Sequence, residues 1–243
     1  MKAFYLPFIF SLLNSSCSSQ DDRQEKVDKL RALGVSTQPL TAAPGTTVNL
    51  TYYLAGPPKL ILKSEVFTDT NSSIALQSPA TVNSSSMTET NYGNLSVYQF
   101  SGTVTIPLEA QGFIMDSAPL RSRFGSRVFS TSGDEQKMVG DVLVYSPNAK
   151  ELKYSPTTVD IQTLPSPIIT AGTTQAVSLT YNPVNDENFR VGWFVSGGEI
   201  KNRRAKSTDW TVPSDSGAHT LIATIRGLKS SAFSIKVLTV NIQ

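Results

Sequence analysis

The chain of 243 residues contains one cysteine, Cys17, and one histidine, His219. Thiol and imidazole groups often supply the nucleophile, the general base or the metal ligands of a protein site. With one residue of each type, no intramolecular disulfide forms and no metal site is built from several Cys or His ligands. A Cys-His pair would have to join opposite ends of the chain. The sequence therefore predicts neither a metal site nor a cofactor.

Common catalytic patterns are also absent from the sequence. His219 is the only imidazole base for a Ser-His-Asp triad, and there is no Gly-x-Ser-x-Gly elbow, no Gly-rich phosphate loop and no paired-histidine motif. We therefore expect a protein that is not an enzyme. A glycoside hydrolase that uses two carboxylates stays open because Asp and Glu are present, although none of them stands in a recognisable context.

The charge balance excludes one large class of partner. The 21 Lys and Arg residues nearly cancel the 19 Asp and Glu residues, which leaves a formal net charge of +2. Nucleic-acid-binding domains carry a strong positive field, and this composition does not provide one. We expect no nucleic-acid partner. The hydrophobic fraction of 39% is sufficient for globular domains with their own cores.

The N-terminus has the order of a secretory signal peptide. Lys2 is followed by an apolar run from Ala3 to Leu13 and then by small polar residues up to Cys17. A helix needs roughly 20 apolar residues to cross a bilayer, so this run is too short to span one and suits the central region of a signal peptide. We expect residues 1–16 to be the signal peptide, and no transmembrane helix in the mature chain.

An apolar run that ends in small residues and a cysteine, followed by the polar residues 18–22, resembles a bacterial lipoprotein precursor. The resemblance implies cleavage just before Cys17, diacylglycerol on its thiol and an acyl chain such as palmitate on its amine. Asn14 stands where the family prefers Leu. Ser18 resembles the pattern of lipoproteins sent to the outer membrane of Gram-negative cells. The alternative is ordinary signal-peptidase cleavage, which leaves a soluble periplasmic or secreted protein.

The mature chain is rich in Ser, Thr, Val and Tyr with Pro and Gly punctuation, which is a β composition. An internal repeat divides it: the segments 35–39 and 44–52 have counterparts at 161–165 and 171–181. Each copy has an extended strand, a Pro break, a Gly turn and a second strand with alternating apolar residues. Because Pro cannot donate to a sheet ladder, it ends a strand or switches it at an edge.

The repeat predicts an all-β fold of two tandem antiparallel sandwiches. A polar tether over residues 17–26 would precede a first domain over 27–150 and a second over 155–243. Between Val27 and Val35 the spacing also fits a helix, and we favour a strand from Leu33 onward. The first copy further contains a polar insertion at 71–94 and strands at 97–106 and 138–145. The second copy has about seven expected strands, which is typical of a sandwich: 159–163, 176–181, 189–195, 199–202, 208–212, 219–226 and 232–242.

The segments 191–200, 208–213 and 216–221 are similar to bacterial immunoglobulin-like domains, especially the polycystic-kidney-disease-like group. The resemblance covers residues 157–243. It implies that a tryptophan of the third strand fills the core, that a second one precedes the final hairpin, and that a histidine replaces a usual structural tyrosine. The implied structural residues are Trp193, Trp210 and His219.

Three further groups of residues suggest binding, each with a simpler explanation. The segment 186–188 (Asp-Glu-Asn) offers oxygen ligands for calcium but lacks the ligand spacing of a dedicated loop, so a solvated turn is the simpler interpretation. A basic run would contact anionic lipid headgroups or lipopolysaccharide, or protect an edge strand from aggregation. Several tyrosines would stack on sugars or fill the core. The basic run is Lys201, Arg203, Arg204 and Lys206, and the tyrosines are Tyr52, Tyr53, Tyr92 and Tyr98.

Together these features predict a lipid-anchored protein of the cell envelope. Its immunoglobulin-like domains would act as a non-enzymatic spacer, adhesion or assembly module. The expected partners are the membrane, through the N-terminal lipid, and envelope proteins or glycans. A surface carbohydrate-binding module is the alternative, followed by the carboxylate-dependent glycoside hydrolase.

Overall fold

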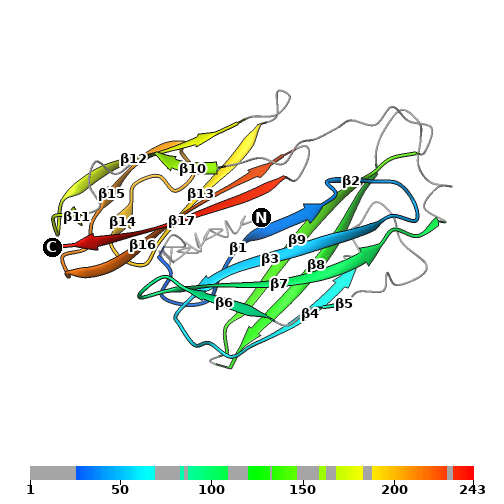
Figure 1. Ribbon diagram of the computed structural model, residues 1–243, viewed down its shortest axis with the longest axis horizontal. Coiled ribbons are helices and arrows are strands. Elements are labelled where there is room, and N and C mark those ends of the chain that lie inside the picture. The colour runs from blue at the N-terminus through cyan, green and yellow to red at the C-terminus, as the bar shows by residue number, and fades with distance from the viewer. Residues whose placement is uncertain are drawn as a thin grey trace, which may run out of the picture.

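The computed structural model describes residues 26–68, 83–84, 87–108, 120–131, 133–146, 159–162, 168–182, 188–228 and 232–243. These residues form β-strands with connecting turns and contain no α-helix, so the predicted all-β class is confirmed. The strands make two sandwiches of two sheets each, which lie side by side along the long axis of the molecule (Figure 1).

The first sandwich packs a sheet of order β1-β3-β7-β5, with β6 also on β7, against a sheet of order β2-β9-β8-β4. All its strand pairs are antiparallel except β2 with β9. Its strands are β1 (Arg31–Gln38), β2 (Thr41–Ala42), β3 (Thr47–Gly56), β4 (Leu62–Thr68), β5 (Asn83–Ser84), β6 (Thr88–Asn91), β7 (Ser96–Thr105), β8 (Leu120–Ser130) and β9 (Glu135–Val144).

The second sandwich repeats this arrangement. One sheet has the order β10-β12-β15-β14 and the other β11-β17-β16-β13, with only β11 and β17 parallel. Its strands are β10 (Val159–Gln162), β11 (Ile168–Ile169), β12 (Thr174–Tyr181), β13 (Phe189–Val195), β14 (Glu199–Ile200), β15 (Ser207–Thr211), β16 (Gly217–Gly227) and β17 (Phe233–Ile242).

The strand order is that of an immunoglobulin-like sandwich. If the strands of either half are lettered in chain order, with the short second strand counted as a continuation of the first and with β5 and β6 counted together as one strand, one sheet reads A-B-E-D and the other continues G-F-C. In the first sandwich the switch between sheets occurs at Pro39, since β1 pairs with β3 whereas β2 pairs with β9. The predicted proline break is therefore a change of sheet. The described parts of the repeated segments include equivalent strands of the two halves, β1 and β10 for the first segment and β3 and β12 for the second.

Each sandwich has its own apolar core, built by alternation along the strands. In β3, Val48, Leu50, Tyr52 and Leu54 are buried, while the residues between them from Thr47 to Thr51 are exposed or half-buried. In the first core the ring of Tyr52 stacks on Phe100 with 4.7 Å between centroids. The second core surrounds two fully buried indoles, Trp193 and Trp210.

Some expectations about local structure were wrong. Residues 31–38 form one strand, so the helical alternative for Val27–Val35 does not occur and the strand begins two residues before Leu33. The strands Leu62–Thr68 and Leu120–Ser130 were not predicted. Of the polar insertion at 71–94, the described part contains β5 and β6, which both pair with β7. Most of the expected link between the two copies lies outside the described residues.

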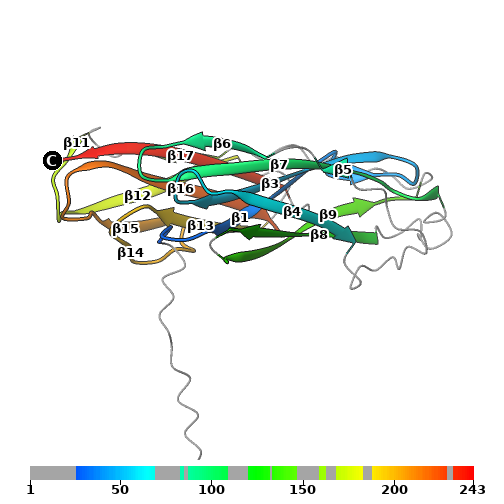
Figure 2. The same ribbon diagram turned by 90° about the horizontal axis from the view of Figure 1, so that it is seen from below.

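A third apolar cluster joins the two sandwiches. Leu95 and Val97 of the first sandwich pack with Ile222 of the second, and all three are buried. The ring of Tyr53 lies 5.5 Å from the ring of Phe233 across the same junction. β1 contacts both β16 and β17 here (Figure 2). The partly buried residues of this cluster include Phe194, Ile235 and Val237.

Polar contacts complete the junction. Arg226 Nη2 of the second sandwich lies 2.6 Å from Asp141 Oδ2 of the first, and only 3% of the Asp141 side chain is exposed. The Thr220 hydroxyl donates to the carbonyl of Tyr92 at 2.6 Å. The two sandwiches therefore share a buried, hydrogen-bonded interface instead of being joined only by a linker.

Candidate functional site: a basic cleft at the sandwich junction

An open cleft of about 420 Å³ lies where the two sandwiches meet. One wall comes from β1 and β9 of the first sandwich. The other comes from β13 and the turn between β14 and β15 of the second. The lining residues are Arg31, Ala32, Gln136, Val191, Gly192, Trp193, Phe194, Arg203 and Arg204.

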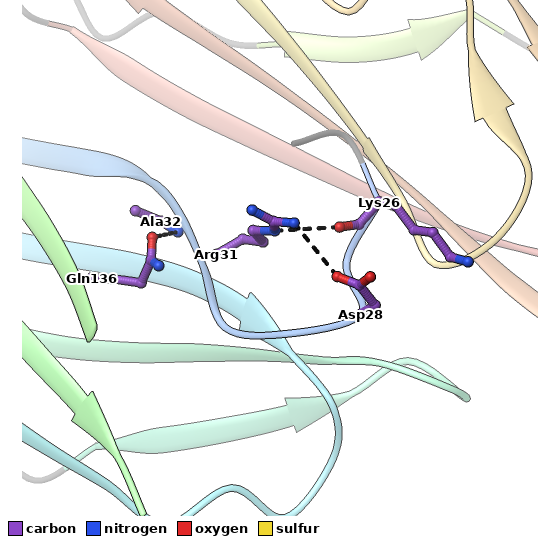
Figure 3. Close-up of polar contacts among 5 residues, drawn as sticks. All are labelled: Lys26, Asp28, Arg31, Ala32 and Gln136. Atoms are coloured by element: carbon purple, nitrogen blue, oxygen red, sulfur yellow. Dashed lines mark hydrogen bonds and ion pairs between the residues drawn. The ribbon is translucent and has the colours of Figure 1, made fainter. Parts of the chain in front are cut away.

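Arg31 is the most enclosed charged residue of the cleft, with 10% of its side chain exposed. Its Nε donates to the carbonyl of Lys26 at 3.3 Å, and its Nη2 lies 3.5 Å from Asp28 Oδ1 (Figure 3). Both partners belong to the segment that leads into β1, and this segment turns back toward the guanidinium group. Arg31 is thus held by the chain that immediately precedes it.

The same leading segment is fixed to the second sandwich. Lys26 forms a parallel bridge with Val195, and the Val27 N–H donates to the Val195 carbonyl at 2.8 Å. β13 is the last strand of its sheet, so it offers unpaired backbone groups. The chain entering the first sandwich therefore covers part of the edge of the second, next to the cleft.

Gln136 supplies a neutral amide on the wall formed by the first sandwich. Its Oε1 accepts a hydrogen bond from the Ala32 N–H at 3.2 Å, and its Nε2 donates to the Glu135 carbonyl at 2.9 Å. The bond to Ala32 connects β9 to β1 (Figure 3), and the bond to Glu135 lies within β9. The amide thus orients the start of β1, from which Arg31 projects.

Trp193 holds the basic turn of the second sandwich. Its backbone N–H donates to the Arg203 carbonyl at 3.0 Å, and its indole Nε1 donates to the Ala205 carbonyl at 2.9 Å. Asn202 Oδ1 accepts from the Arg204 N–H at 3.1 Å. Because Trp193 is fully buried, the turn that carries Arg203 and Arg204 is anchored directly to the core.

The basic run predicted as one patch is divided in the structure. Arg203 and Arg204 line the cleft with Arg31, which the sequence analysis did not single out. Lys201 instead pairs with Asp209, with Nζ and Oδ2 3.3 Å apart. The Lys206 ammonium lies 5.0 Å from the centroid of the Tyr181 ring. Two of the four predicted residues therefore belong to the cleft and two lie beside it.

The cleft has the chemistry of an anion-binding site. Guanidinium groups keep their positive charge at physiological pH and present up to five N–H donors in a plane. No carboxylate is among the described residues that line the cleft, and Asp28 contacts Arg31 from its flank. Arginine and glutamine side chains bind and orient an anion but provide neither a nucleophile nor a general base at neutral pH.

The tyrosines considered for sugar stacking are placed elsewhere. Tyr52 and Tyr98 are buried in the first core, and burial raises the pKa of both phenols. The Tyr98 hydroxyl donates to the Pro57 carbonyl at 2.5 Å and accepts from the Leu60 N–H at 2.9 Å. The rings of Tyr53 and Tyr92 pack in the cluster between the sandwiches. The four tyrosines therefore do not form an exposed stacking surface.

His219 lies near the start of β16 and is 4% exposed. Its Nε2 is 3.3 Å from Asp215 Oδ2, and its Nδ1 is buried without a hydrogen-bond partner among the described residues. A Cβ on Gly197 would approach the imidazole, which indicates tight packing around the ring. The imidazole is therefore buried against the turn that contains Gly197.

Other candidates lie outside the cleft or outside the described residues. Within the described part of the chain, no three His, Cys, Asp or Glu side chains gather as ligands for a metal ion. That part also contains no helix with the length and apolar character needed to cross a membrane. Cys17 and residues 186 and 187 of the acidic loop lie outside it.

A comparison of the sequence with models of protein families and with curated proteins finds no match. Among solved structures, the chain is similar to the fibronectin(III)-like modules of CbhA from Clostridium thermocellum, with 16% identity, 86% of this chain and 92% of that chain covered, and a TM-score of 0.31.

Two further solved structures are also similar to the chain. One is the full ectodomain (Ig1–Ig3) of mouse nectin-like molecule 4, with 13% identity, 88% and 65% coverage, and a TM-score of 0.30. The other is SGBP-B of the Bacteroides ovatus mixed-linkage glucan utilization locus, in complex with a mixed-linkage heptasaccharide, with 14% identity, 84% and 43% coverage, and a TM-score of 0.20. The assignment of the immunoglobulin-like fold rests on the strand order described above.

Proposed function

We propose that this chain is a lipid-anchored protein of the cell envelope, attached to the membrane through Cys17. Its two immunoglobulin-like sandwiches would act together as a non-enzymatic spacer, adhesion or assembly module. One observation carries the proposal: a signal-like N-terminus that ends at the only cysteine is followed, after a short polar segment, by two packed sandwiches. Several acyl chains would make the attachment stable, because each buried methylene contributes about 0.8 kcal/mol.

The junction between the sandwiches supports the role of a spacer. Domains joined only by a linker move relative to each other, whereas buried apolar contacts and a charged hydrogen bond resist such motion. Here Leu95, Val97 and Ile222 are buried at the junction, and Arg226 pairs with Asp141 beside them. The proposal includes the outer membrane of a Gram-negative cell as the location, on the basis of Ser18, and a polycystic-kidney-disease-like identity for the second sandwich.

The test is fractionation of cells that express the full chain or its Cys17→Ala variant. We expect the parent protein in the membrane fraction, resistant to high salt and alkaline carbonate, and the variant in the soluble fraction. Ser19→Ala is the matched control, because it changes a neighbouring small residue without removing the thiol. If Cys17→Ala left the protein in the membrane fraction unchanged, the lipid anchor would be wrong.

A carbohydrate-binding module is the alternative function, and the described tyrosines give it no support. Sugar-binding surfaces commonly use exposed aromatic faces, whereas Tyr52 and Tyr98 are buried and Tyr53 and Tyr92 pack at the junction. A glycan array with the purified full chain distinguishes the two functions. Specific binding to one glycan class would favour the module over the spacer.

A further inference from the structure

We infer that the cleft at the sandwich junction is a binding site for a phosphate group carried by a small organic ester. Arg31 enters the cleft from the first sandwich, and Arg203 and Arg204 enter it from the second. Planar guanidinium groups match the oxygen geometry of phosphate through paired hydrogen bonds. Three guanidinium groups line this cleft, whose described lining contains no carboxylate, and Asp28 pairs with Arg31 from the flank. Such a group of cations attracts an anion locally even where the net charge of the chain is small.

The arginines are held in place by the fold. Arg31 is fixed by the carbonyl of Lys26 and by Asp28 and has only 10% of its side chain exposed. The turn with Arg203 and Arg204 is tied to the buried Trp193 by two hydrogen bonds. A site whose backbone is already ordered loses less conformational entropy when an anion binds.

The size of the cleft indicates more than an isolated phosphate. Its volume of about 420 Å³ lies in the range of small-molecule sites, roughly 300–1,000 Å³. The lining also includes Val191 and Phe194, which would provide apolar contacts for the organic part of an ester. A glycerophosphate-like group therefore fits the chemistry of the lining better than a free inorganic ion.

Such a group has two sources, a phospholipid headgroup or a soluble phosphate ester. Lys26 lies beside the cleft and is the last residue of the predicted tether. If the chain is anchored at Cys17, the nine residue-to-residue steps from Cys17 to Lys26 span at most about 30 Å, which keeps the cleft near the headgroups. Only this preference for a headgroup rests on the proposed anchor; the phosphate site itself does not.

The experiment uses the full chain with Cys17→Ala, which cannot carry a thiol-linked lipid, and glycerol phosphate as the probe in isothermal titration calorimetry. The cleft variant is Arg203→Glu with Arg204→Glu. The flank variant is Lys201→Glu with Lys206→Glu, which reverses two charges in the same segment outside the cleft lining. Circular dichroism and thermal melting verify folding, and Arg203→Gln with Arg204→Gln replaces the cleft variant if charge reversal prevents folding.

We expect the cleft variant to weaken binding about tenfold or more, because each charge-assisted hydrogen bond that is lost costs about a factor of ten. The flank variant should change the affinity by no more than about twofold, as expected for exposed charges. Absence of binding by the parent chain at millimolar glycerol phosphate would overturn the proposal. Equal losses in both variants would overturn it too, because they would indicate diffuse attraction to a basic surface.

Vesicles separate the two sources. The same chains are sedimented with vesicles of phosphatidylglycerol in phosphatidylcholine, with and without glycerol phosphate as competitor. Binding that the cleft variant and the competitor abolish supports a headgroup as the natural ligand. Calorimetric binding without vesicle binding supports a soluble ester. If Cys17→Ala does not change the membrane fractionation but the chain binds glycerol phosphate, the lipid anchor is refuted and the phosphate site is supported.

Discussion

The ion pair between Asp141 and Arg226 should couple the two sandwiches energetically. Arg226 Nη2 and Asp141 Oδ2 are 2.6 Å apart, with 3% of the Asp141 side chain and 40% of the Arg226 side chain exposed. We propose to measure this with Asp141→Asn, Arg226→Met and the double variant. Asparagine preserves the shape of the aspartate, and methionine keeps the apolar part of the arginine.

A hydrogen bond to a charged group contributes about 1.5–3 kcal/mol, and removing one partner of a fully buried pair costs about 3–5 kcal/mol. Because water still reaches Arg226, we expect the coupling energy between Asp141 and Arg226 to lie in the lower of these two ranges, at about 2 kcal/mol. Arg226→Met should destabilise the protein more than Asp141→Asn, since it leaves a buried carboxylate with a weaker set of partners. Arg123 remains, with its Nε 3.4 Å from Asp141 Oδ1.

The assay is urea denaturation of the full chain, with hydrogen exchange at the Val27 amide as a local probe. That amide donates to Val195 across the junction, so it should exchange faster when the sandwiches separate. The matched control is a cycle with Arg123→Met, whose partner lies in the same sandwich and whose side chain is 44% exposed. Equal coupling energies in the two cycles, or an unchanged exchange rate at Val27, would refute a special role for Arg226.

Two further predictions concern stability. Hydrogen bonds from the Lys59 N–H and the Ser96 hydroxyl lower the pKa of Glu89 in the folded protein. The ionised Glu89 side chain therefore stabilises the fold at a pH above its unfolded pKa of about 4.3, and this stabilisation is lost as the pH falls through the folded pKa. The stability advantage over Glu89→Gln in urea melts should therefore disappear in acid, and a constant advantage would contradict this. A Cβ on Gly34 would overlap the ring of Phe233 at the junction. Gly34→Ala should therefore lower the free energy of unfolding by about 1–3 kcal/mol in urea melts. An unchanged urea midpoint would contradict this and would show that the interface adapts.

Local sequence patterns predicted much of the second sandwich. The apolar alternation around Trp193 gave the strand Phe189–Val195, and the Gly residues at 197 and 198 gave the turn that follows it. The predicted proline break at Pro39 lies where the chain of the first sandwich changes sheet. These features depend on residues close together in the chain, where backbone preferences and alternation act directly.

The rest depends on contacts between distant residues. In the strand Leu120–Ser130, three of the buried positions are the serines Ser122, Ser126 and Ser130, so its sequence shows no simple apolar alternation. The cleft was also not predictable, because it combines three distant parts of the chain. These are the first residues of β1, the start of β9, where Gln136 lies 104 residues after Ala32, and a turn of the other sandwich. The one local signal was the basic run at 201–206, which identified two of the three arginines.

The most direct test of the account is mass spectrometry of the N-terminal peptide of the protein isolated from membranes. We expect the mature chain to begin at Cys17, with diacylglycerol on the thiol of this residue and an acyl chain on its amine. A mature N-terminus at another residue, or an unmodified Cys17, would contradict the central claim that the two sandwiches are attached to the membrane by lipid.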